Sequence, residues 1–155
     1  MIKPNYFIIP IVVFLTSTLG GFITSKGMDW YKGLNLPEIT PPGYVISIAW
    51  TIIFILTAIS CLIYYNKAFR NARFVFVITL FLINAGLNIL WSYLFFNLHL
   101  VGAAILEMII LEATVLLLIY LVRPTSKLAS ALLYPYAAWV VFATYLAYQT
   151  LLLNT

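Results

Sequence analysis

The chain has 155 residues, of which 65% are hydrophobic and 8% are charged, and its mean hydropathy is +1.08. A soluble domain carries roughly a quarter charged residues, so this composition excludes a soluble enzyme, a nucleic-acid-binding module and a disordered tail. It indicates a polytopic membrane protein. We therefore interpret the net charge of +4 as an indicator of membrane orientation and not of nucleic-acid binding. The single cysteine, Cys61, cannot form an internal disulfide.

Five apolar stretches are long enough to cross a bilayer, which takes about 20 helical residues each. They cover residues 6–23, 44–65, 74–96, 101–122 and 128–153. The first stretch is longer than the roughly 7–15 apolar residues of a signal peptide, and no Ala-x-Ala cleavage pattern follows it. We therefore predict an all-α integral membrane protein, with residues 1–155 forming one bundle of five transmembrane helices.

The long connection between the first two stretches, residues 24–43, differs from the others. It combines turn-forming residues with aromatic ones, namely Gly27, Trp30, Tyr31, Gly33, Pro37, Pro41 and Pro42. A long loop in a compact bundle is usually functional or disordered, and the aromatic residues and the Pro-Pro pair argue against disorder. We predict a functional loop.

The next connections are shorter: a basic break at residues 66–73, a tight turn at 97–100, and residues 123–127, where Ser126 is placed to cap the following helix.

The distribution of Lys and Arg predicts the orientation of the bundle. An odd number of spans places the two termini on opposite sides of the membrane. The N-terminal side collects Lys3, Lys67, Arg70, Arg73, Arg123 and Lys127, whereas the other side collects only Lys26 and Lys32. Because cytoplasmic loops carry the excess of Lys and Arg, we predict a multi-pass protein of the cell membrane with a cytoplasmic N-terminus and an external long loop.

Polar side chains in the third span lie on one helical face, since Asn84, Asn88 and Trp91 are spaced by four and three residues. Two amides in hydrocarbon are unfavourable unless they are paired. Two interpretations remain open. The amides bond neighbouring helices to one another, or they line a cavity and meet a ligand's carbonyl or carboxylate group.

Spans two and five each carry a tryptophan about two turns inside the helix, deeper than an interfacial anchor. Trp50 shares its face with Ile46 and Phe54, and Trp139 shares its face with Tyr136 and Ala143. Two indoles that project into one cavity would stack on a flat apolar ligand. The alternative is that both tryptophans pack against helices or face lipid.

The remaining ionisable residues do not predict a catalytic or metal site. Glu107 and Glu112 lie about 140° apart on their helix, so they do not form a carboxylate pair, and we expect Glu107 to lie near a helix end. His99 is the single histidine, and no Cys/His cluster, serine triad or nucleotide-binding glycine motif is present. These absences exclude hydrolases, kinases and metalloenzymes, and we expect no metal and no cofactor.

Three segments together resemble the translocator protein family, also called tryptophan-rich sensory proteins or peripheral-type benzodiazepine receptors, and specifically its bacterial members. The first loop of that family resembles Trp30–Leu34 with Pro37, Pro41 and Pro42. Its third-helix motif resembles Leu87–Trp91 with Phe95 and Phe96, and its fifth-helix motif resembles Leu132–Trp139 with Phe142–Thr144. The segments occur in the family's order and extend over nearly the whole chain.

The resemblance implies a central ligand cavity between the five helices, covered by the first loop as a lid. It implies binding of porphyrins such as protoporphyrin IX and of apolar drug-like molecules, and some bacterial members degrade porphyrin in light. The predicted ligand-binding residues are Ile46, Trp50, Phe54, Asn84, Asn88, Trp91, Trp139 and Ala143, and the predicted lid residues are Trp30, Tyr31, Lys32, Pro41 and Pro42. Trp50 and Trp139 are the candidates for the light-dependent step, because an indole is readily oxidised.

Some positions depart from the family pattern. Leu36, Ile39, Ala147 and Glu107 replace residues that are more usual there, and no basic residue follows Tyr148, so a proposed sterol motif is incomplete.

We predict a porphyrin receptor or chaperone, with the porphyrin as ligand or substrate. The alternatives are a carrier for tetrapyrroles or lipids and a structural membrane protein without a ligand. The expected partners are the bilayer and an apolar small molecule but no nucleic acid. A second copy of the chain, in a homodimer, is a further candidate partner.

Overall fold

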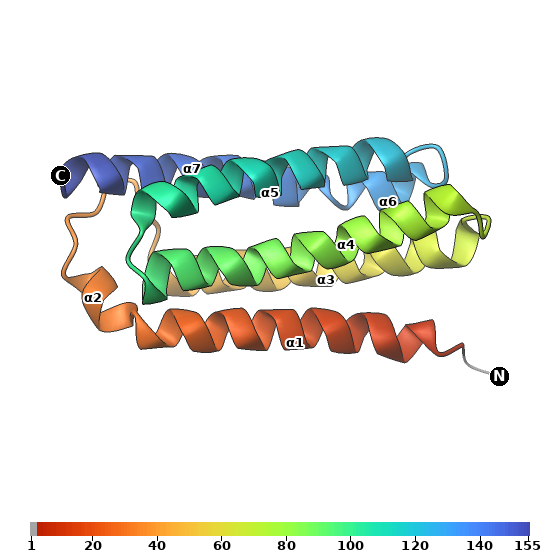
Figure 1. The fold of residues 1–155 in the computed structure, drawn as a ribbon, viewed down its shortest axis with the longest axis horizontal. Coiled ribbons are helices and arrows are strands. Elements are labelled where there is room, and N and C mark those ends of the chain that lie inside the picture. Colours follow the sequence, from red (N-terminus) through yellow and green to blue (C-terminus); the bar gives the residue numbers. More distant parts are fainter. Residues whose placement is uncertain (1–2) are drawn as a thin grey trace.

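The computed structural model describes residues 3–155 and consists of helices that run side by side (Figure 1). In chain order these are α1 (Asn5–Lys26), α2 (Met28–Lys32), α3 (Gly43–Lys67), α4 (Ala72–Ser92), the π-helix η1 (Tyr93–Asn97), α5 (Val101–Val122), α6 (Lys127–Ala131) and α7 (Tyr134–Leu153). Five spans, in which α4 with η1 and α6 with α7 each count as one, are long and apolar enough to cross a membrane. The predicted five-helix membrane bundle is confirmed.

Helix α4 lies at the centre of the arrangement, where it packs against α1, α3 and α5, while α7 packs mainly against α5. The N-terminus and the C-terminus lie at opposite ends of the bundle (Figure 1), as an odd number of spans requires. Helix α2 and the rest of residues 27–42 lie at the same end as the C-terminus. We call this the lid end and call residues 27–42 the lid.

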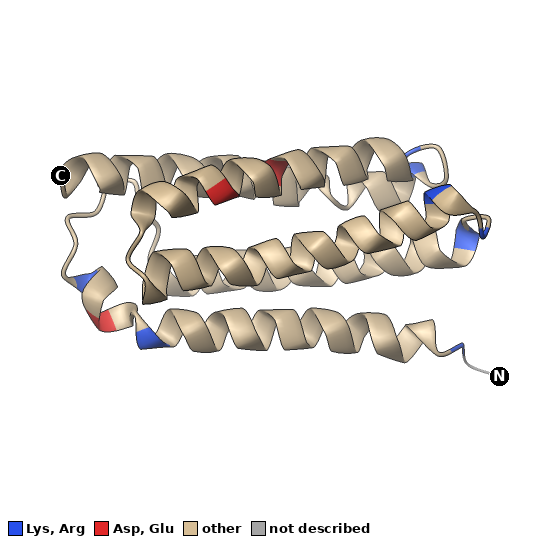
Figure 2. Cartoon of the chain, in the orientation of Figure 1, with Lys and Arg blue, Asp and Glu red and all other residues tan. Residues whose placement is uncertain are grey.

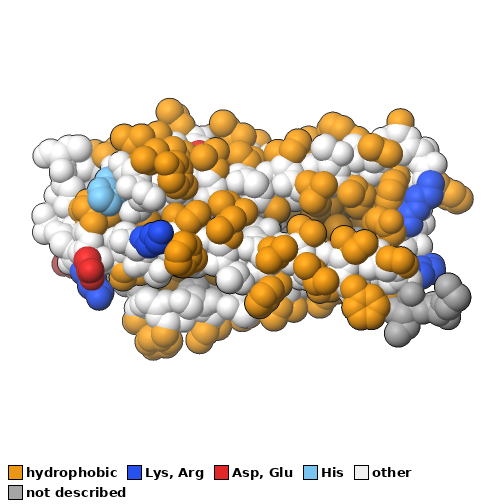
Figure 3. Space-filling model, turned by 60° about the horizontal axis from the view of Figure 1, so that its bottom comes forward, with side chains coloured by type: hydrophobic (Ala, Val, Ile, Leu, Met, Phe, Trp, Pro, Cys, Tyr) orange, Lys and Arg blue, Asp and Glu red, His pale blue; other side chains and the backbone are white. Residues whose placement is uncertain are grey.

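Apolar side chains cover the outside of the bundle as well as its interior. Figure 3 shows them over most of the visible face, and Phe14, Leu106 and Tyr120 are among the most exposed. In water such a surface would be strongly unfavourable, whereas lipid tails solvate it.

The core falls into two clusters. One at the lid end includes Phe95 and Met108, and one at the opposite end includes Tyr64 and Leu118.

The segment between the first two spans is more helical than predicted. Helix α1 continues to Lys26, and α2 occupies Met28–Lys32, so the expected loop over residues 24–43 is wrong in nearly its first half. Gly27 makes the break between these two helices. A Cβ atom there would overlap the backbone carbonyl oxygen of Phe96 in η1, so only glycine allows α1 to turn against the π-helix.

The fifth span is not the single helix predicted over 128–153. It divides into α6 and α7 around Leu132 and Leu133. Pro135 lies in the first turn of α7, where a proline is tolerated because its missing N–H would have no helical partner. A continuous helix would instead bring its ring against the carbonyl group four residues earlier. The predicted cap is confirmed, because the Ser126 hydroxyl accepts a hydrogen bond from the Ala129 N–H at 3.3 Å.

Candidate functional site

A cavity of about 170 Å³ lies at the lid end between α1, α3, the end of α4, η1 and α7, with the lid above it. We call it the lid pocket. Ile46, Trp50, Trp91, Trp139 and Ala143 of the predicted ligand-binding set line it, together with Thr24, Met28, Tyr31, Thr40, Gly43, Ser47, Phe95, Phe96, Leu146, Ala147 and Thr150. Residues from distant parts of the chain thus meet at one site, since the third-helix motif and the fifth-helix motif both contribute a tryptophan.

Aromatic rings form one wall of the lid pocket. The Trp50 and Trp91 ring centroids are 6.3 Å apart with an interplanar angle of 33°, and Trp91 stacks on Phe95 at 5.5 Å and 29°. Trp139 stands on α7 and packs against Phe142 at 5.6 Å. Such a site offers broad π-faces to a flat ligand.

Two hydrogen-bond donors in this wall have no partner within the described residues. The indole Nε1 atoms of Trp91 and Trp139 are both buried and make no hydrogen bond there. Leaving a buried donor unpaired is unfavourable by about 1–3 kcal/mol. Both residues line the lid pocket, and because both nitrogen atoms are buried, a ligand with acceptor groups at its edge reaches them only if the indole rings turn toward the cavity.

A second cavity of about 230 Å³ adjoins the lid pocket between α1, α3 and α4, and we call it the middle pocket. The two share Thr24, Ile46, Ser47, Trp50 and Trp91. Phe54 and Asn88 of the predicted ligand-binding set line the middle pocket rather than the lid pocket. Several hydroxyl groups also border it, including those of Ser17, Thr51 and Ser92, so it is the more polar of the two.

The two asparagines of α4 are held by other helices. The Tyr136 hydroxyl of α7 donates to Asn84 Oδ1 at 3.0 Å and accepts from Asn88 Nδ2 at 3.1 Å, and Asn84 Nδ2 donates to the Thr114 hydroxyl of α5 at 2.8 Å. The interpretation that these amides join neighbouring helices therefore has direct support. Asn84 lines neither pocket described above.

The sequence analysis did not predict that Tyr136 bonds the two asparagines, and placed it only on the same helix face as Trp139. A tyrosine within an apolar span needs a hydrogen-bond partner for its hydroxyl, and this requirement was the available signal. The structure shows that this hydroxyl joins both asparagines.

The predicted lid residues do not all face the lid pocket. Tyr31 lines it and packs against Phe96 at 5.6 Å, and burial raises the pKa of Tyr31. Trp30 instead stacks on His99 at 4.1 Å. Lys32 is exposed and lies 4.0 Å from the carboxylate of Asp29.

The prolines of the lid serve a different purpose from its aromatic residues. Pro41 and Pro42 do not line the lid pocket, and Pro42 directly precedes α3 with an extended backbone. A proline fixes its own backbone angle and restricts the preceding residue. The pair therefore sets the direction in which the lid enters α3.

Of the two acidic residues of α5, Glu107 is buried inside the bundle and Glu112 is half-buried. Glu107 lies in the second turn of α5, where the predicted span 101–122 places it, and its side chain is only 5% exposed. Neither of its carboxyl oxygens has a hydrogen-bond partner in the described part of the chain. Over residues 3–155, no group of three or more His, Cys, Asp or Glu side chains is arranged to hold a metal ion.

The sequence matches the model of the TspO/MBR family over residues 7–153. The chain belongs to the TspO/MBR family. It is 38% identical over 136 residues to the Tryptophan-rich protein TspO of Archaeoglobus fulgidus, covering 87% of each chain. It is 37% identical over 150 residues to the Tryptophan-rich protein TspO of Bacillus cereus, covering 93% of this chain and 95% of that one.

This TspO/MBR protein is also similar to a Translocator protein of Sus scrofa, with 31% identity over 140 residues that cover 86% of this chain and 83% of that one. The resemblance drawn from three sequence motifs is thereby confirmed. The structure adds that residues of all three motifs meet at the lid end, since Tyr31, Trp91 and Trp139 line the same cavity.

Proposed function

We propose that this TspO/MBR protein is a membrane receptor that binds porphyrins of the protoporphyrin IX type, and other flat apolar molecules, in the lid pocket. The observation that carries the proposal is the wall of aromatic rings, Trp50, Trp91 and Phe95, in a cavity that is also bordered by the hydroxyl groups of Thr24, Thr40, Ser47 and Thr150. A largely apolar pocket with a few convergent polar groups is the usual form of a small-molecule site.

The chemistry of a porphyrin suits this arrangement. Its two faces are apolar and stack on indole rings, as Trp50 and Trp91 offer. Its edge carries carboxylates, which accept hydrogen bonds from indole N–H groups. Lys26 lies at the lid end and makes no ion pair within the described residues, so it is the basic side chain available there to an acidic edge, whereas Lys32 lies 4.0 Å from the Asp29 carboxylate.

We further propose that light can destroy the bound porphyrin. The macrocycle is the photosensitiser and molecular oxygen is the oxidant, so the difficult chemistry belongs to the ligand and the protein positions it. Trp50 and Trp139 are the oxidisable side chains assigned to receive or relay the reactive oxygen species.

The direct test is a titration of the purified protein in detergent with protoporphyrin IX, followed by porphyrin absorbance and tryptophan fluorescence. Saturable binding at one porphyrin per chain, with quenching of the indoles, is expected. Linear, non-saturating uptake that equals uptake by empty micelles would overturn the proposal.

A carrier for tetrapyrroles or lipids is the second candidate. One structural observation favours it: the lid pocket and the middle pocket share five lining residues and together reach from the lid to Asn88. The similar protein of Sus scrofa also bears the name Translocator protein. Porphyrin flux into sealed vesicles that contain the protein, compared with flux into empty vesicles, separates a carrier from a receptor.

We also propose that the N-terminus is cytoplasmic. Lys67, Arg70, Arg73, Arg123 and Lys127 lie at the end of the bundle that also holds the N-terminus, and Figure 2 shows most of the basic residues there. Cytoplasmic loops carry this excess. The lid would then face the outside of the cell.

A further inference from the structure

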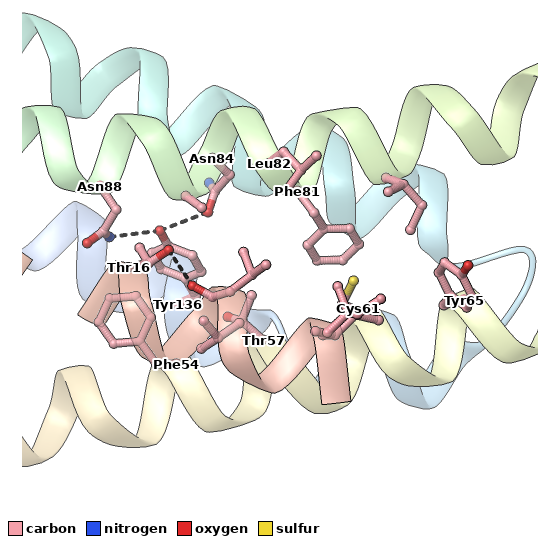
Figure 4. Close-up of a pocket in the computed structure, with 16 residues that line it drawn as sticks. Thr16, Phe54, Thr57, Cys61, Tyr65, Phe81, Leu82, Asn84, Asn88 and Tyr136 are labelled. Carbon is pink, nitrogen blue, oxygen red and sulfur yellow. Dashed lines mark hydrogen bonds between the residues drawn. The ribbon is translucent and has the colours of Figure 1, made fainter. Parts of the chain in front are cut away.

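A third cavity, of about 190 Å³, lies toward the end of the bundle away from the lid (Figure 4). We call it the far pocket. It lies between α1, α3 and α4, and its wall is almost entirely apolar, with Val12, Cys61, Ile78 and Phe81 among its residues. Phe54, Asn84 and Asn88 of the predicted ligand-binding set line it, but neither the lid nor Trp91 nor Trp139 does, so the porphyrin site proposed in the lid pocket does not account for it.

The far pocket is bordered by residues on the outer face of the bundle. Ile8 and Leu82 line it and are 57% and 55% exposed. Both lie within membrane-spanning helices, α1 and α4. The surroundings of this border are therefore lipid tails rather than water.

The far pocket has the length of one lipid leaflet. Along α3 its wall runs from Phe54 to Tyr65, which is about 16 Å at 1.5 Å per residue. One leaflet accounts for half of a hydrocarbon core that is about 30 Å thick, or about 15 Å. A single acyl chain that lies along α3 would therefore match the pocket in both length and polarity.

The two ends of the far pocket differ in chemistry. Figure 4 shows Asn84, Asn88 and Tyr136 at one end and Tyr65 at the other. The first three are hydrogen-bonded to one another through the Tyr136 hydroxyl. They close the pocket deep in the bundle.

At the Tyr65 end, the guanidinium carbon of Arg70 lies 4.1 Å from the ring centroid of Tyr65 and 3.9 Å from that of Phe74. Cation–π contacts of this kind hold the guanidinium beside this end of the pocket. Within residues 3–155, no carboxylate lies within ion-pair distance of Arg70. The neighbouring Arg73 already donates to the Leu121 carbonyl oxygen at 2.9 Å.

We propose that the far pocket binds one acyl chain of an anionic phospholipid from the leaflet at the basic end, with the lipid phosphate against Arg70. Charge complementarity selects this occupant. The chain's acidic residues are Asp29, Glu38, Glu107 and Glu112, and none of them lies in the loops at the basic end. A basic side chain near an anionic leaflet attracts its lipids.

The test uses the full-length protein in phosphatidylcholine nanodiscs that contain a small fraction of phosphatidylglycerol with a diazirine on its acyl chain. After illumination, cross-linked residues are mapped by mass spectrometry. The matched probe is phosphatidylcholine with the same diazirine. We expect the anionic probe to label inward-facing residues of the far pocket, such as Cys61 and Phe81, and the zwitterionic probe to label them about 5-fold less.

Two substitutions separate the local site from general attraction to a basic surface. Arg70→Gln should reduce labelling of the far pocket by the anionic probe about 5-fold. Lys127→Gln removes the same charge from the same end but does not touch Tyr65, so it should leave that labelling within 2-fold of the unmodified protein. Equal labelling by both probes, labelling confined to outward-facing residues, or equal effects of the two substitutions would overturn the proposal. No porphyrin is present, so the result does not depend on the function of the lid pocket.

Discussion

Asn154 joins the C-terminal end of α7 to the lid through the backbone of Asn35. The Asn35 N–H donates to Asn154 Oδ1 at 3.0 Å, and Asn154 Nδ2 donates to the Asn35 carbonyl oxygen at 2.9 Å, although the residues are 119 positions apart. The side chain of Asn154 therefore pairs with the lid as a neighbouring strand would. This contact fastens the middle of the lid to the same helix that carries Trp139.

The first prediction is that Asn154→Ala loosens the lid. Both hydrogen bonds are lost, and because they are exposed each contributes near the lower limit of about 0.5–1.5 kcal/mol. Hydrogen exchange of the backbone around residues 33–36 should accelerate by about 5-fold or more, and porphyrin should dissociate faster. Thr155→Ala is the matched control, since the neighbouring Thr155 hydroxyl contacts only the Leu152 carbonyl oxygen. Equal exchange in both variants would show that other contacts hold the lid.

The second prediction concerns the close approach of α1 to η1. In Gly27→Ala the new methyl group meets backbone atoms of Phe96, which cannot rotate away as a side chain can. Overpacking of this kind destabilises by about 1–3 kcal/mol, and thermal unfolding in detergent should show a lower Tm. Gly21→Ala serves as the control, because a Cβ there meets nothing within 4 Å. A Tm for Gly27→Ala at or above that control would mean that the two helices separate freely.

The third prediction compares two tryptophans of the lid pocket. Trp139→Phe keeps an aromatic face but removes an unpartnered N–H, so porphyrin affinity should fall by about 10- to 150-fold, the scale of a hydrogen bond to a charged group. Trp50→Phe should keep most of the affinity, because its indole contributes mainly a stacking face. Both variants should slow the light-driven loss of saturating porphyrin, measured as absorbance against illumination time. If both bleach porphyrin at the unmodified rate, the photochemistry belongs to porphyrin and oxygen alone.

The fourth prediction concerns the hydroxyl that joins Asn84 and Asn88. Tyr136→Phe leaves two buried amides with a lost partner and should lower the free energy of unfolding by about 1–3 kcal/mol. Denaturant-induced unfolding in detergent measures this difference. Tyr134→Phe, two residues away and 52% exposed, should have little effect. A fall in porphyrin affinity without a fall in stability would instead indicate that the amides serve the ligand.

The fifth prediction concerns orientation. After Cys61→Ser removes the native thiol, a maleimide that cannot cross the membrane should label Lys32→Cys in intact cells and should label Arg70→Cys only after the cells are opened. The cause is the excess of Lys and Arg at the Arg70 end, which is retained in the cytoplasm. Labelling of Arg70→Cys in intact cells would place the N-terminus outside.

The predicted spans begin and end within a few residues of the observed helices, because hydropathy and helix length are local properties of a chain in lipid. Two residues indicate helix ends that the predicted spans missed. Pro135 lies where the fifth span divides, and Gly27 lies where the first helix ends. Glu107 lies in the second turn of α5, as the predicted span places it, but only the structure shows that its side chain is buried.

The class of this protein, its five membrane spans, its family and the residue types of a ligand site all follow from the amino-acid sequence. Which side chains meet one another follows from the packing of the helices. It places Trp91 and Trp139 at one cavity, turns Trp30 toward His99, and pairs Asn84 and Asn88 with Tyr136. The physical reason is that burial in lipid is set by composition along one helix, whereas hydrogen bonds and ring contacts between helices depend on how each helix is rotated and packed against its neighbours.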